Sequence, residues 1–497
     1  MLNKKVFLFI IAILILMTPL LTACGEAVEN TSKDAISMDE DDSFPLSKKV
    51  FDTTIKVFCV ASTRHLYGEQ QFVPNDESKT AVVNDAVARR NDYIEQEYGI
   101  KIEIATAGYP SPGEEVANSI TSGLDEYQIV ADAVYRMLPN ATKNYYWSLE
   151  KDLKLDRDWW DQNAIENLSI TDKTYFVAGD ALITDDDHTY LILYNKKMYE
   201  ENTGFSDKYG NIYDFVRDGK WTYDAMYEMA KAVSRPDDQG QWTTTEGTYG
   251  LLGESYGTGI LVAGSGITSA EKTSDGGIQL MVDSEKSTRA FDKVFNMLTD
   301  TSATIRVEQL GEGGWGKISN MFIDGKGLFY CTSASTITSI KTNTAENKAD
   351  FGVLPIPKFD EDQDKYYNGI NIYQSSVMGV PTTNVQKYDA TIYLLEALGY
   401  YSKNTPGGSS VTDAYYEITL KLQGMDTSDD EEMLDIVFRN RLYDIGAIYD
   451  WGGSLLGIYA NVMRSGSNTL ASSFDAIKEG ARIAMEETIE EYSKITT

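Results

Sequence analysis

Strand-like and helix-like segments alternate along the first part of this chain. Residues 55–60 form a short β-rich run, 81–98 carry apolar residues at helical spacing, and 100–104 alternate isoleucine with polar residues. A second helix is predicted over 113–122 and a third strand over 127–131. This β-α-β-α-β order predicts a parallel, doubly wound sheet, so the fold class is α/β.

Polar residues follow two of these strands at the places where such a sheet binds ligands. Ligands of doubly wound sheets collect beyond the carboxyl ends of the strands. Thr63 follows the first strand, and Asp132 and Tyr135 follow the third. We therefore predict that these three side chains line a ligand site.

A further helix has clear ends in the sequence. Thr222 is a good N-cap residue, and Pro236 marks the end of the helix. Met226, Met229 and Val233 form one apolar face between them, which is typical of a helix packed on a core.

The size and charge of the chain limit its architecture and its partners. With 497 residues and 42% hydrophobic content, it can bury a large core, and we expect two lobes. The formal net charge is −32. Binding to phosphate groups depends on Lys and Arg, so this charge argues against nucleic acid as a partner.

The N-terminus has the features of an export signal. Lys4 and Lys5 precede the apolar run Val6–Leu21, which is shorter than the roughly 20 residues of a membrane-spanning helix. Leu21-Thr22-Ala23-Cys24 resembles a bacterial lipobox, which predicts a signal peptide over 1–23 and lipid, palmitate included, on Cys24. The alternative is an uncleaved signal anchor.

Export would leave an acidic tether and a lipid-anchored protein. Cleavage removes two lysines and no acids, which takes the formal charge from −32 to −34. Residues 24–51 are polar and acidic, and we interpret them as the lipid anchor and a flexible tether. The predicted location is the extracytoplasmic face of the cell membrane.

Two cysteines remain besides Cys24. Cys59 and Cys331 both lie in apolar, strand-like runs, where a free thiol behaves as a small hydrophobe. A disulfide between them is the alternative in an oxidising compartment, and we favour free thiols. The cysteine count excludes a disulfide scaffold.

Five segments resemble, in the expected order, the extracellular solute-binding lipoproteins of ABC importers, in the family 1 branch that mostly serves sugars. They are RNDYIEQEYGIKIEI at 90–104, LYNKKMY at 193–199, WTYD at 221–224, MFIDGKGLF at 321–329 and FGVLPIP at 351–357. The resemblance covers most of the chain and implies a type II periplasmic-binding-protein-like fold. Two α/β lobes, each with a doubly wound and mostly parallel sheet, would be joined by a hinge with ligand between them.

The resemblance also implies lobe boundaries. Lobe one would comprise 52–190 and 352–402, and lobe two 191–351 and 403–497. A few residues in the crossings would change φ/ψ when the lobes close around a ligand.

Further candidate ligand residues come from the family pattern. His188 lies just before the first crossing, and Tyr256 follows an apolar segment of lobe two. In the family a similar strand end corresponds to Ser333 and Ser335, and a C-terminal position that often holds a stacking aromatic corresponds to Asp450 and Trp451. Cys331-Thr332-Ser333 departs from the pattern, because a Trp is often found there, which argues against a long malto-oligosaccharide groove.

Two segments invite other interpretations. Gly253-Glu254-Ser255-Tyr256-Gly257 fits the G-x-S-x-G nucleophile elbow of α/β-hydrolases. Both histidines, His65 and His188, lie upstream of Ser255, and we expect no β-strand before it. The run 185–188, Asp-Asp-Asp-His, is predicted to be a solvated turn, with a metal site or a carboxylate cluster as the alternative.

These observations predict a binding protein without chemistry, cofactor or metal. A monomer on a lipid anchor would capture a small polar ligand, for which we favour a carbohydrate or oligosaccharide, and deliver it to an ABC permease. The alternatives are a surface glycan-processing enzyme and a sensory binding subunit without transport.

Overall fold

The structure is a computed structural model that describes residues 43–75, 80–343, 350–422 and 428–495. Leu46–Thr497 form one compact unit. The lipobox, Cys24 and most of the predicted tether lie outside the described residues. In the part of the chain that is described, no helix combines the length and apolar character needed to cross a bilayer.

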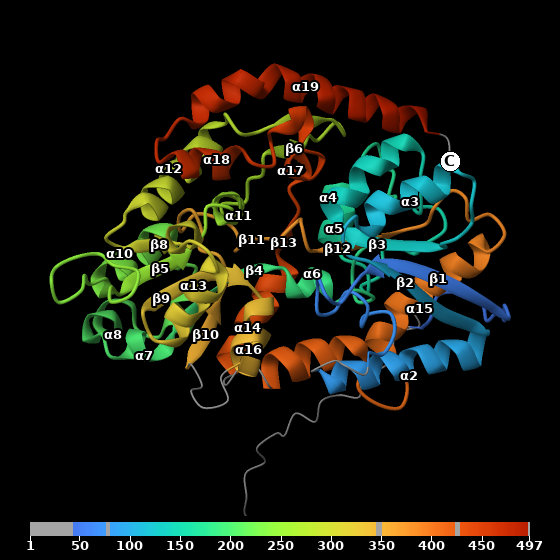
Figure 1. Cartoon of the computed structure of the whole chain (residues 1–497), viewed down its shortest axis with the longest axis horizontal. Helices are drawn as coiled ribbons and strands as arrows, with labels where there is room; N and C mark the ends of the chain where they lie inside the picture. Colours follow the sequence, from blue (N-terminus) through green and yellow to red (C-terminus); the bar gives the residue numbers. More distant parts are fainter. Residues whose placement is uncertain (1–42, 76–79, 344–349, 423–427, 496–497) are drawn as a thin grey trace, which may run out of the picture. The chain divides into compact units, whose positions relative to one another are not determined.

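The first sheet has the predicted doubly wound core. Strands β1 (Thr53–Val60), β2 (Ile100–Ala107) and β3 (Ile129–Ala133) are parallel, and the order is β12-β3-β1-β2. Helices α2 (Ala81–Tyr98) and α3 (Pro112–Thr121) connect them. Figure 1 shows α2 beside α15 (Tyr388–Asn404) on one side of this sheet and α3 on the other. The α/β fold class is therefore confirmed.

The second sheet has the order β10-β4-β9-β5-β8. Strand β5 is parallel to β8 and β9, and β4 is antiparallel to β9 and β10. Its helices include α10, which packs on β5 and β9, and α13, which packs on the same two strands. The strands and helices of this part are β4 (Tyr190–Asn195), α7 (Lys196–Glu200), α8 (Thr203–Tyr209), α9 (Ile212–Arg217), α10 (Tyr223–Val233), β5 (Tyr249–Gly253), α11 (Gly257–Gly264), β6 (Ala270–Lys272), β7 (Ile278–Leu280), α12 (Glu285–Thr299), β8 (Thr304–Arg306), α13 (Gly314–Ile323), β9 (Gly327–Ser333), α14 (Ser335–Asn343) and β10 (Phe351–Leu354).

Each sheet contains one reversed strand, because the chain enters each sheet from the other lobe. Tyr190 at the start of β4 pairs with Ser333 at the end of β9. Ser376 at the start of β12 (Ser376–Gly379) pairs with Ala133 at the end of β3. Both crossings therefore enter a sheet at the edge where its parallel strands end, which brings the crossings next to the strand ends of both sheets.

The predicted lobe boundaries stay a prediction, and the sheet pairing bears on one of them. The expected return to lobe one at 352 falls inside β10, which pairs with β4 of the second sheet. The segment 355–375, which includes β11 (Asn368–Gly369), then leads to β12 in the first sheet. We propose that this crossing begins near residue 355.

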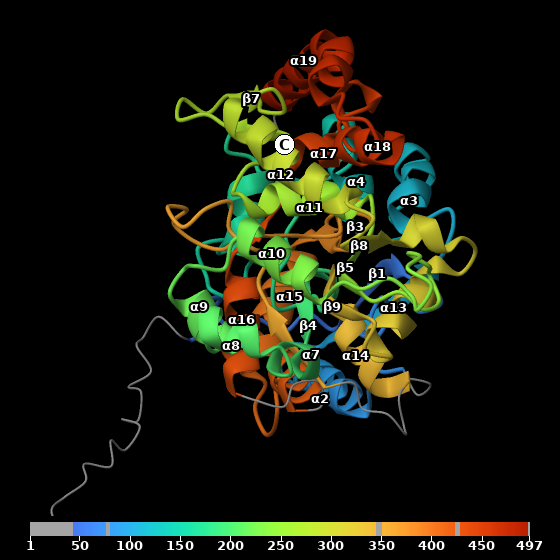
Figure 2. The same cartoon turned by 90° about the vertical axis from the view of Figure 1, so that its left-hand side faces the viewer.

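The C-terminal region, residues 403–497, is predicted to belong to lobe two alone, but its helices contact both lobes. A π-helix, η4 (Asp413–Leu422), packs on α2, and α16 (Ser428–Arg439) packs on β10. Helix α17 (Ile445–Tyr449) contacts α4 (Val134–Met137) and η2 (Leu138–Lys143) of the first lobe. Helix α17 also contacts β6 of the second lobe, and Figures 1 and 2 both show α19 (Leu470–Lys494) above α17 and α18 (Ile458–Ser465). We propose that this region belongs to both lobes.

Other sequence predictions are confirmed locally. Thr222 caps α10, with its hydroxyl oxygen accepting a hydrogen bond from the Ala225 N–H at 3.3 Å. Cys59 lies in β1 and Cys331 in β9, and both are buried free thiols. They lie in different sheets, which agrees with the favoured absence of a disulfide between them.

A fully buried arginine, Arg90, links α2 to α15 and to the segment around Gln71 by hydrogen bonds. Arg90 donates to Ser402 Oγ on α15 and to the Gln71 carbonyl, each at 2.8 Å, and to Asn91 Oδ1 at 3.1 Å. Burial lowers its pKa to about 9. The planar guanidinium can serve these acceptors in separate directions, which a single ammonium group cannot do.

We expect Arg90→Lys to lower the free energy of unfolding by about 2 kcal/mol or more, because buried acceptors lose charge-assisted hydrogen bonds. Urea unfolding of the full-length protein measures this. Arg482→Lys is the matched control, because Arg482 pairs only with exposed acids on α19. Equal losses in the two variants would contradict the role assigned to Arg90.

Candidate functional site

The strand ends of the first sheet hold two arginines and an exposed tyrosine. Arg64 follows β1, Tyr109 follows β2 and Arg136 follows β3. The guanidinium carbons of Arg64 and Arg136 lie 4.5 and 5.3 Å from the centroid of the Tyr109 ring. Tyr109 is 74% exposed, so its ring is available to a ligand.

Hydrogen bonds and ionic contacts to other protein groups orient both arginine side chains. Arg64 Nη2 donates to the Tyr373 carbonyl at 3.3 Å, and its Nη1 lies 3.8 Å from Asp132 Oδ1. Arg136 Nη1 donates to Ser111 Oγ at 2.9 Å and pairs with Glu114. The two guanidiniums are thereby oriented at one edge of the sheet.

Asp132 lies buried beneath the strand ends of the first sheet and makes hydrogen bonds there. It is fully buried, and it accepts hydrogen bonds from the backbone N–H groups of Gly113 at 3.0 Å and Ala133 at 2.7 Å. Burial raises the pKa of its carboxyl. The sequence placed Asp132 correctly at the end of β3, but its oxygens serve helix α3 and Arg64 rather than open space.

A line of tyrosines connects the two lobes. Tyr135, half-buried on α4, packs edge-on against Tyr373 of the crossing segment, with ring centroids 4.8 Å apart. Tyr373 lies 5.4 Å from Tyr256, and Tyr256 lies 6.4 Å from Tyr190 at the start of β4. The structure therefore brings together the predicted residues Tyr135 and Tyr256, which are far apart in the sequence.

A buried carboxyl lies on the lobe-two side of this line. Glu254 is 5% exposed and accepts a hydrogen bond from the Tyr190 hydroxyl at 2.7 Å. Burial raises the pKa of Glu254 from 4.5 to about 7; the Tyr190 hydrogen bond opposes this shift, and Glu308 adds to it. At neutral pH the group is thus poised between its neutral and charged forms.

The other predicted strand-end residues are Thr63, Ser333 and Ser335. Thr63 is exposed in the turn after β1. Ser333 and Ser335 are half-buried at the end of β9, and their hydroxyl oxygens are 2.8 Å apart. Thr63 therefore supplies a hydroxyl after a strand of the first sheet, and Ser333 and Ser335 supply hydroxyls after a strand of the second sheet.

Asp450 and Trp451 make their contacts within the C-terminal region. Trp451 is 2% exposed, is stacked on Tyr449 with centroids 5.4 Å apart, and donates from Nε1 to Thr488 Oγ1 at 2.9 Å. Asp450 Oδ1 accepts from the Leu456 N–H at 2.8 Å. Trp451 therefore packs beneath α19 in this structure, and a stacking role for its ring stays a prediction.

The acidic run at the first crossing is buried, which corrects the prediction of a solvated turn. It forms the short helix α6 (Thr184–Asp187), and Asp185 is 1% exposed. Arg441 from the C-terminal region pairs with Asp186, lies 3.6 Å from Asp185 Oδ2 and lies 3.0 Å from Asp161 Oδ2. The carboxylates are buried because one distant arginine lies among them.

His188 is part of the same buried crossing. It is 5% exposed, and its Nδ1 lies 3.0 Å from the Thr184 carbonyl oxygen. Its ring centroid lies 5.3 Å from that of His65, whose pKa burial lowers to about 3. His188 therefore lies within the protein at the hinge rather than on an open wall.

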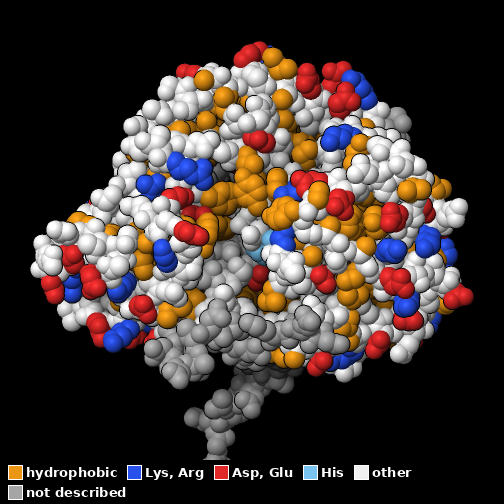
Figure 3. Space-filling model, viewed as in Figure 1, with side chains coloured by type: hydrophobic (Ala, Val, Ile, Leu, Met, Phe, Trp, Pro, Cys, Tyr) orange, Lys and Arg blue, Asp and Glu red, His pale blue; other side chains and the backbone are white. Residues whose placement is uncertain are grey.

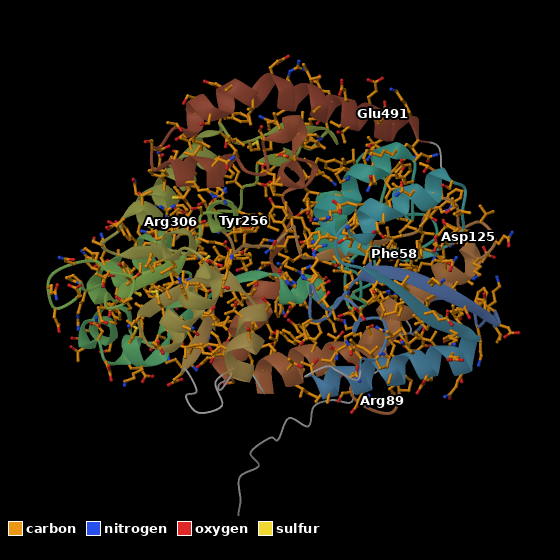
Figure 4. The ribbon with its side chains drawn as sticks, in the orientation of Figure 1. Phe58, Arg89, Asp125, Tyr256, Arg306 and Glu491 are labelled. Carbon is orange, nitrogen blue, oxygen red and sulfur yellow. The ribbon has the colours of Figure 1, made fainter. Side chains whose placement is uncertain are left out.

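The G-x-S-x-G segment does follow a strand, contrary to expectation, because β5 ends at Gly253 and α11 begins at Gly257. Ser255 is nevertheless fully buried, and its hydroxyl accepts a hydrogen bond from Arg306 Nη1 at 3.0 Å. Figure 4 labels Arg306 and also Tyr256, the residue that follows Ser255 in the sequence. Ser255 is therefore closed off from solvent, and its hydroxyl oxygen faces the guanidinium of Arg306.

A cavity of about 50 Å³ adjoins Tyr256, between α11, the segment around β11 and the C-terminal region. On the face shown in Figure 3, hydrophobic side chains gather around a central hollow, where Figure 1 labels α11 and β11. Within the described residues, no group of three His, Cys, Asp or Glu side chains is placed to hold a metal ion.

Sequence reasoning missed five residues of this site: Arg64, Tyr109, Arg136, Glu254 and Tyr373. The strand-end rule pointed to the right positions, since Arg64 and Arg136 each adjoin a predicted residue. Tyr109 and Tyr373 gave no pattern of their own. Their proximity to the arginines exists only in the folded chain.

The sequence matches no protein-family profile and no curated protein. Solved structures do match. A cyclo/maltodextrin-binding protein complexed with maltotetraose shares 15% identity, with a TM-score of 0.56 over 90% of this chain and 99% of that chain. The sugar-binding protein MalE from Xanthomonas citri shares 13% identity, with a TM-score of 0.55 over 89% and 98%.

A third match is the maltose/maltodextrin-binding domain MalE from Bdellovibrio bacteriovorus bound to maltotriose, at 14% identity and a TM-score of 0.52 over 88% and 100% of the two chains. These likenesses establish the fold. The chain has the two-lobed α/β fold of solute-binding proteins, as the sequence motifs predicted.

The raised pKa of Glu254 predicts a pH-dependent stability. The unfolded side chain loses its proton near 4.5 and the folded one near 7, so the native state binds more protons between these values. This contribution is full below pH 4.5 and is lost as the pH rises to 7. Between pH 5 and pH 8, the free energy of unfolding should therefore fall by about 2 kcal/mol more in the wild type than in Glu254→Gln.

Urea unfolding at the two pH values measures this difference, and other buried acids contribute equally to both proteins. The exposed Glu312 provides the control substitution, Glu312→Gln. If wild type and Glu254→Gln had the same pH dependence, the burial argument would be wrong.

Proposed function

We propose that this protein captures a small polar carbohydrate between its two lobes and delivers it to an ABC permease. The observation that carries the proposal is the line Tyr135–Tyr373–Tyr256, which joins the strand ends of both sheets at the crossings. The solved structures with this fold include proteins complexed with maltotetraose and maltotriose.

The chemistry of the site suits a sugar. Aromatic rings pack on the apolar C–H faces of sugar rings, and charged or polar groups bind the hydroxyls. The exposed ring of Tyr109 supplies such a face beside the donors of Arg64 and Arg136. Ser333 and Ser335, which are half-buried after β9, supply hydroxyl groups on the other lobe.

We propose two roles for the residues of the site. Arg64, Tyr109, Tyr135, Tyr256 and Tyr373 contact the ligand, with Thr63, Ser333 and Ser335 at the rim. Asp132, His188, Asp450 and Trp451 position the site from inside, because each is bonded to protein groups.

The cellular setting is also part of the proposal. Cleavage before Cys24 and lipid on that cysteine would hold a monomer on the extracytoplasmic face of the membrane, within reach of a permease. The sequence motifs at 193–199 and 351–357 support the importer assignment.

Binding without turnover separates this function from a glycan-processing enzyme. The hydroxyl of Ser255 is bonded to Arg306, which argues against a nucleophile. A binding protein returns its ligand intact at one-to-one stoichiometry, whereas an enzyme releases products. A sensory subunit would also return the ligand intact, and deletion of the gene would then abolish signalling rather than uptake.

Thermal unfolding of the full-length protein against a panel of sugars, oligosaccharides, amino acids, peptides and anions tests the function. Ligand at about 100 times its Kd stabilises the folded state by roughly 2.7 kcal/mol and raises Tm. We expect a shift with one class of carbohydrate. A shift with peptides or anions alone would overturn the carbohydrate proposal.

We expect Tyr109→Ala to weaken binding of that carbohydrate at least tenfold, because the sugar loses its aromatic face. The fold should be unaffected, since the ring is 74% exposed. Calorimetric titration compares it with Trp242→Ala, a control at an exposed ring beside Tyr249, at the opposite end of β5 from Tyr256. Unchanged affinity in Tyr109→Ala would remove Tyr109 from the site.

A further inference from the structure

Helix α19 is the longest helix in the described part of the chain, and it reaches from one lobe to the other. It spans 25 residues, Leu470–Lys494, which makes it roughly 37 Å long. Figure 1 shows it above both lobes, from α12 toward α3. Hydrogen bonds within the helix hold its two ends at a nearly fixed distance from each other.

The first part of α19 is attached to the second lobe. Just before the helix, Asn468 Nδ2 donates a hydrogen bond to Asp292 Oδ1 of α12 at 2.6 Å. Lys478 pairs with Asp283, which lies just before α12. Helix α12 packs on β8 of the second sheet, so this end of α19 moves with the second lobe.

The last turns of α19 are attached to the first lobe. Tyr492 is 1% exposed, and its ring centroid lies 5.4 Å from that of Tyr175. Lys173 Nζ donates to the carbonyl of Ile495, just beyond the helix. The segment that holds Lys173 and Tyr175 joins the first sheet, because Val177 forms a bridge with β12. This end of α19 therefore moves with the first lobe.

The middle of α19 rests on the turn 451–453. Gly452 has a φ of +73°, and a Cβ atom at this position would lie 3.0 Å from the backbone nitrogen of Ala481. The backbone of the turn therefore lies directly against the helix. Together with the hydrogen bond from Trp451 to Thr488, this contact supports the helix between its two ends.

We infer that α19 is a strap that limits how far the two lobes can move apart in the ligand-free protein. Hinge motion needs changes of φ/ψ at only a few residues of the crossings, which by themselves restrain the open state little. A stiff helix attached to both lobes removes part of this freedom. The lobes can separate along this edge only if the contacts at one end of α19 break. The inference goes beyond ligand capture and does not depend on which ligand binds.

The separation of the lobes can be measured without ligand, by double electron–electron resonance between two spin labels. Asn118→Cys in α3 and Asn320→Cys in α13 place the labels at exposed positions on opposite lobes. Cys59 and Cys331 are buried free thiols. Adding Cys24→Ser to the full-length chain therefore leaves only the two introduced cysteines open to labelling.

Tyr492→Ala and Tyr175→Ala each release the first-lobe end of the strap. We expect both substitutions to lengthen the mean distance between the labels and to broaden its distribution. Tyr199→Ala is the matched control, because Tyr199 is also buried but its hydroxyl donates to the Gly210 carbonyl within the second lobe. This control should leave the wild-type distribution unchanged.

A milder pair of variants decides the question if the tyrosine variants do not fold, which circular dichroism shows. Lys173→Met removes only the hydrogen bond to the Ile495 carbonyl. Lys208→Met is its control, because Lys208 pairs with Glu228 within the second lobe. We expect a smaller lengthening of the distance in Lys173→Met and none in Lys208→Met.

The wild-type distance distribution in the folded variants released at the first-lobe end would overturn the inference, and so would an equal change in their controls. No ligand enters the measurement. Its outcome is therefore independent of whether the protein captures a carbohydrate.

Discussion

The Arg441 guanidinium is the interaction on which the crossing between the lobes depends. It lies among Asp161 at the start of α5 (Gln162–Leu168) and Asp185 and Asp186 of α6, all close to the hinge. Removing one partner of a buried ionic group leaves an uncompensated charge, which is strongly destabilising. The arginine therefore holds the first crossing and the C-terminal region in one arrangement.

That crossing determines where a ligand can bind. The chain enters each sheet at the carboxyl ends of its parallel strands, so β4 and β12 run opposite to their neighbours. The strand ends of both sheets consequently face the same crossing segments, and Tyr373 lies between Tyr135 and Tyr256. In the proposed function, closure of the lobes would move the two sets of strand ends toward each other.

Local patterns predicted the elements whose signals lie within a few residues. The three strands and two helices of the first sheet and the Thr222 cap were predicted because periodicity and capping are local properties. Strand β5 was missed because its sequence, Tyr-Gly-Leu-Leu-Gly, carries two glycines, which are depleted in strands. The burial of 185–187 was missed because its partner Arg441 lies far along the chain. The burial of Trp451 had no local signal, because the residues that cover its ring come from α19.

The sequence by itself determined the fold class, the lipobox-like segment, the two-lobed architecture and the positions just after the strands where ligand groups gather. These follow from hydrophobic period, short motifs and the rule that parallel strands end at one edge. Only the tertiary structure decided which of those side chains face open space. Asp132 turns inward to α3 and Arg64, whereas Tyr109 stays exposed. The reason is physical: burial and hydrogen-bond partners are set by contacts between segments that are far apart along the chain.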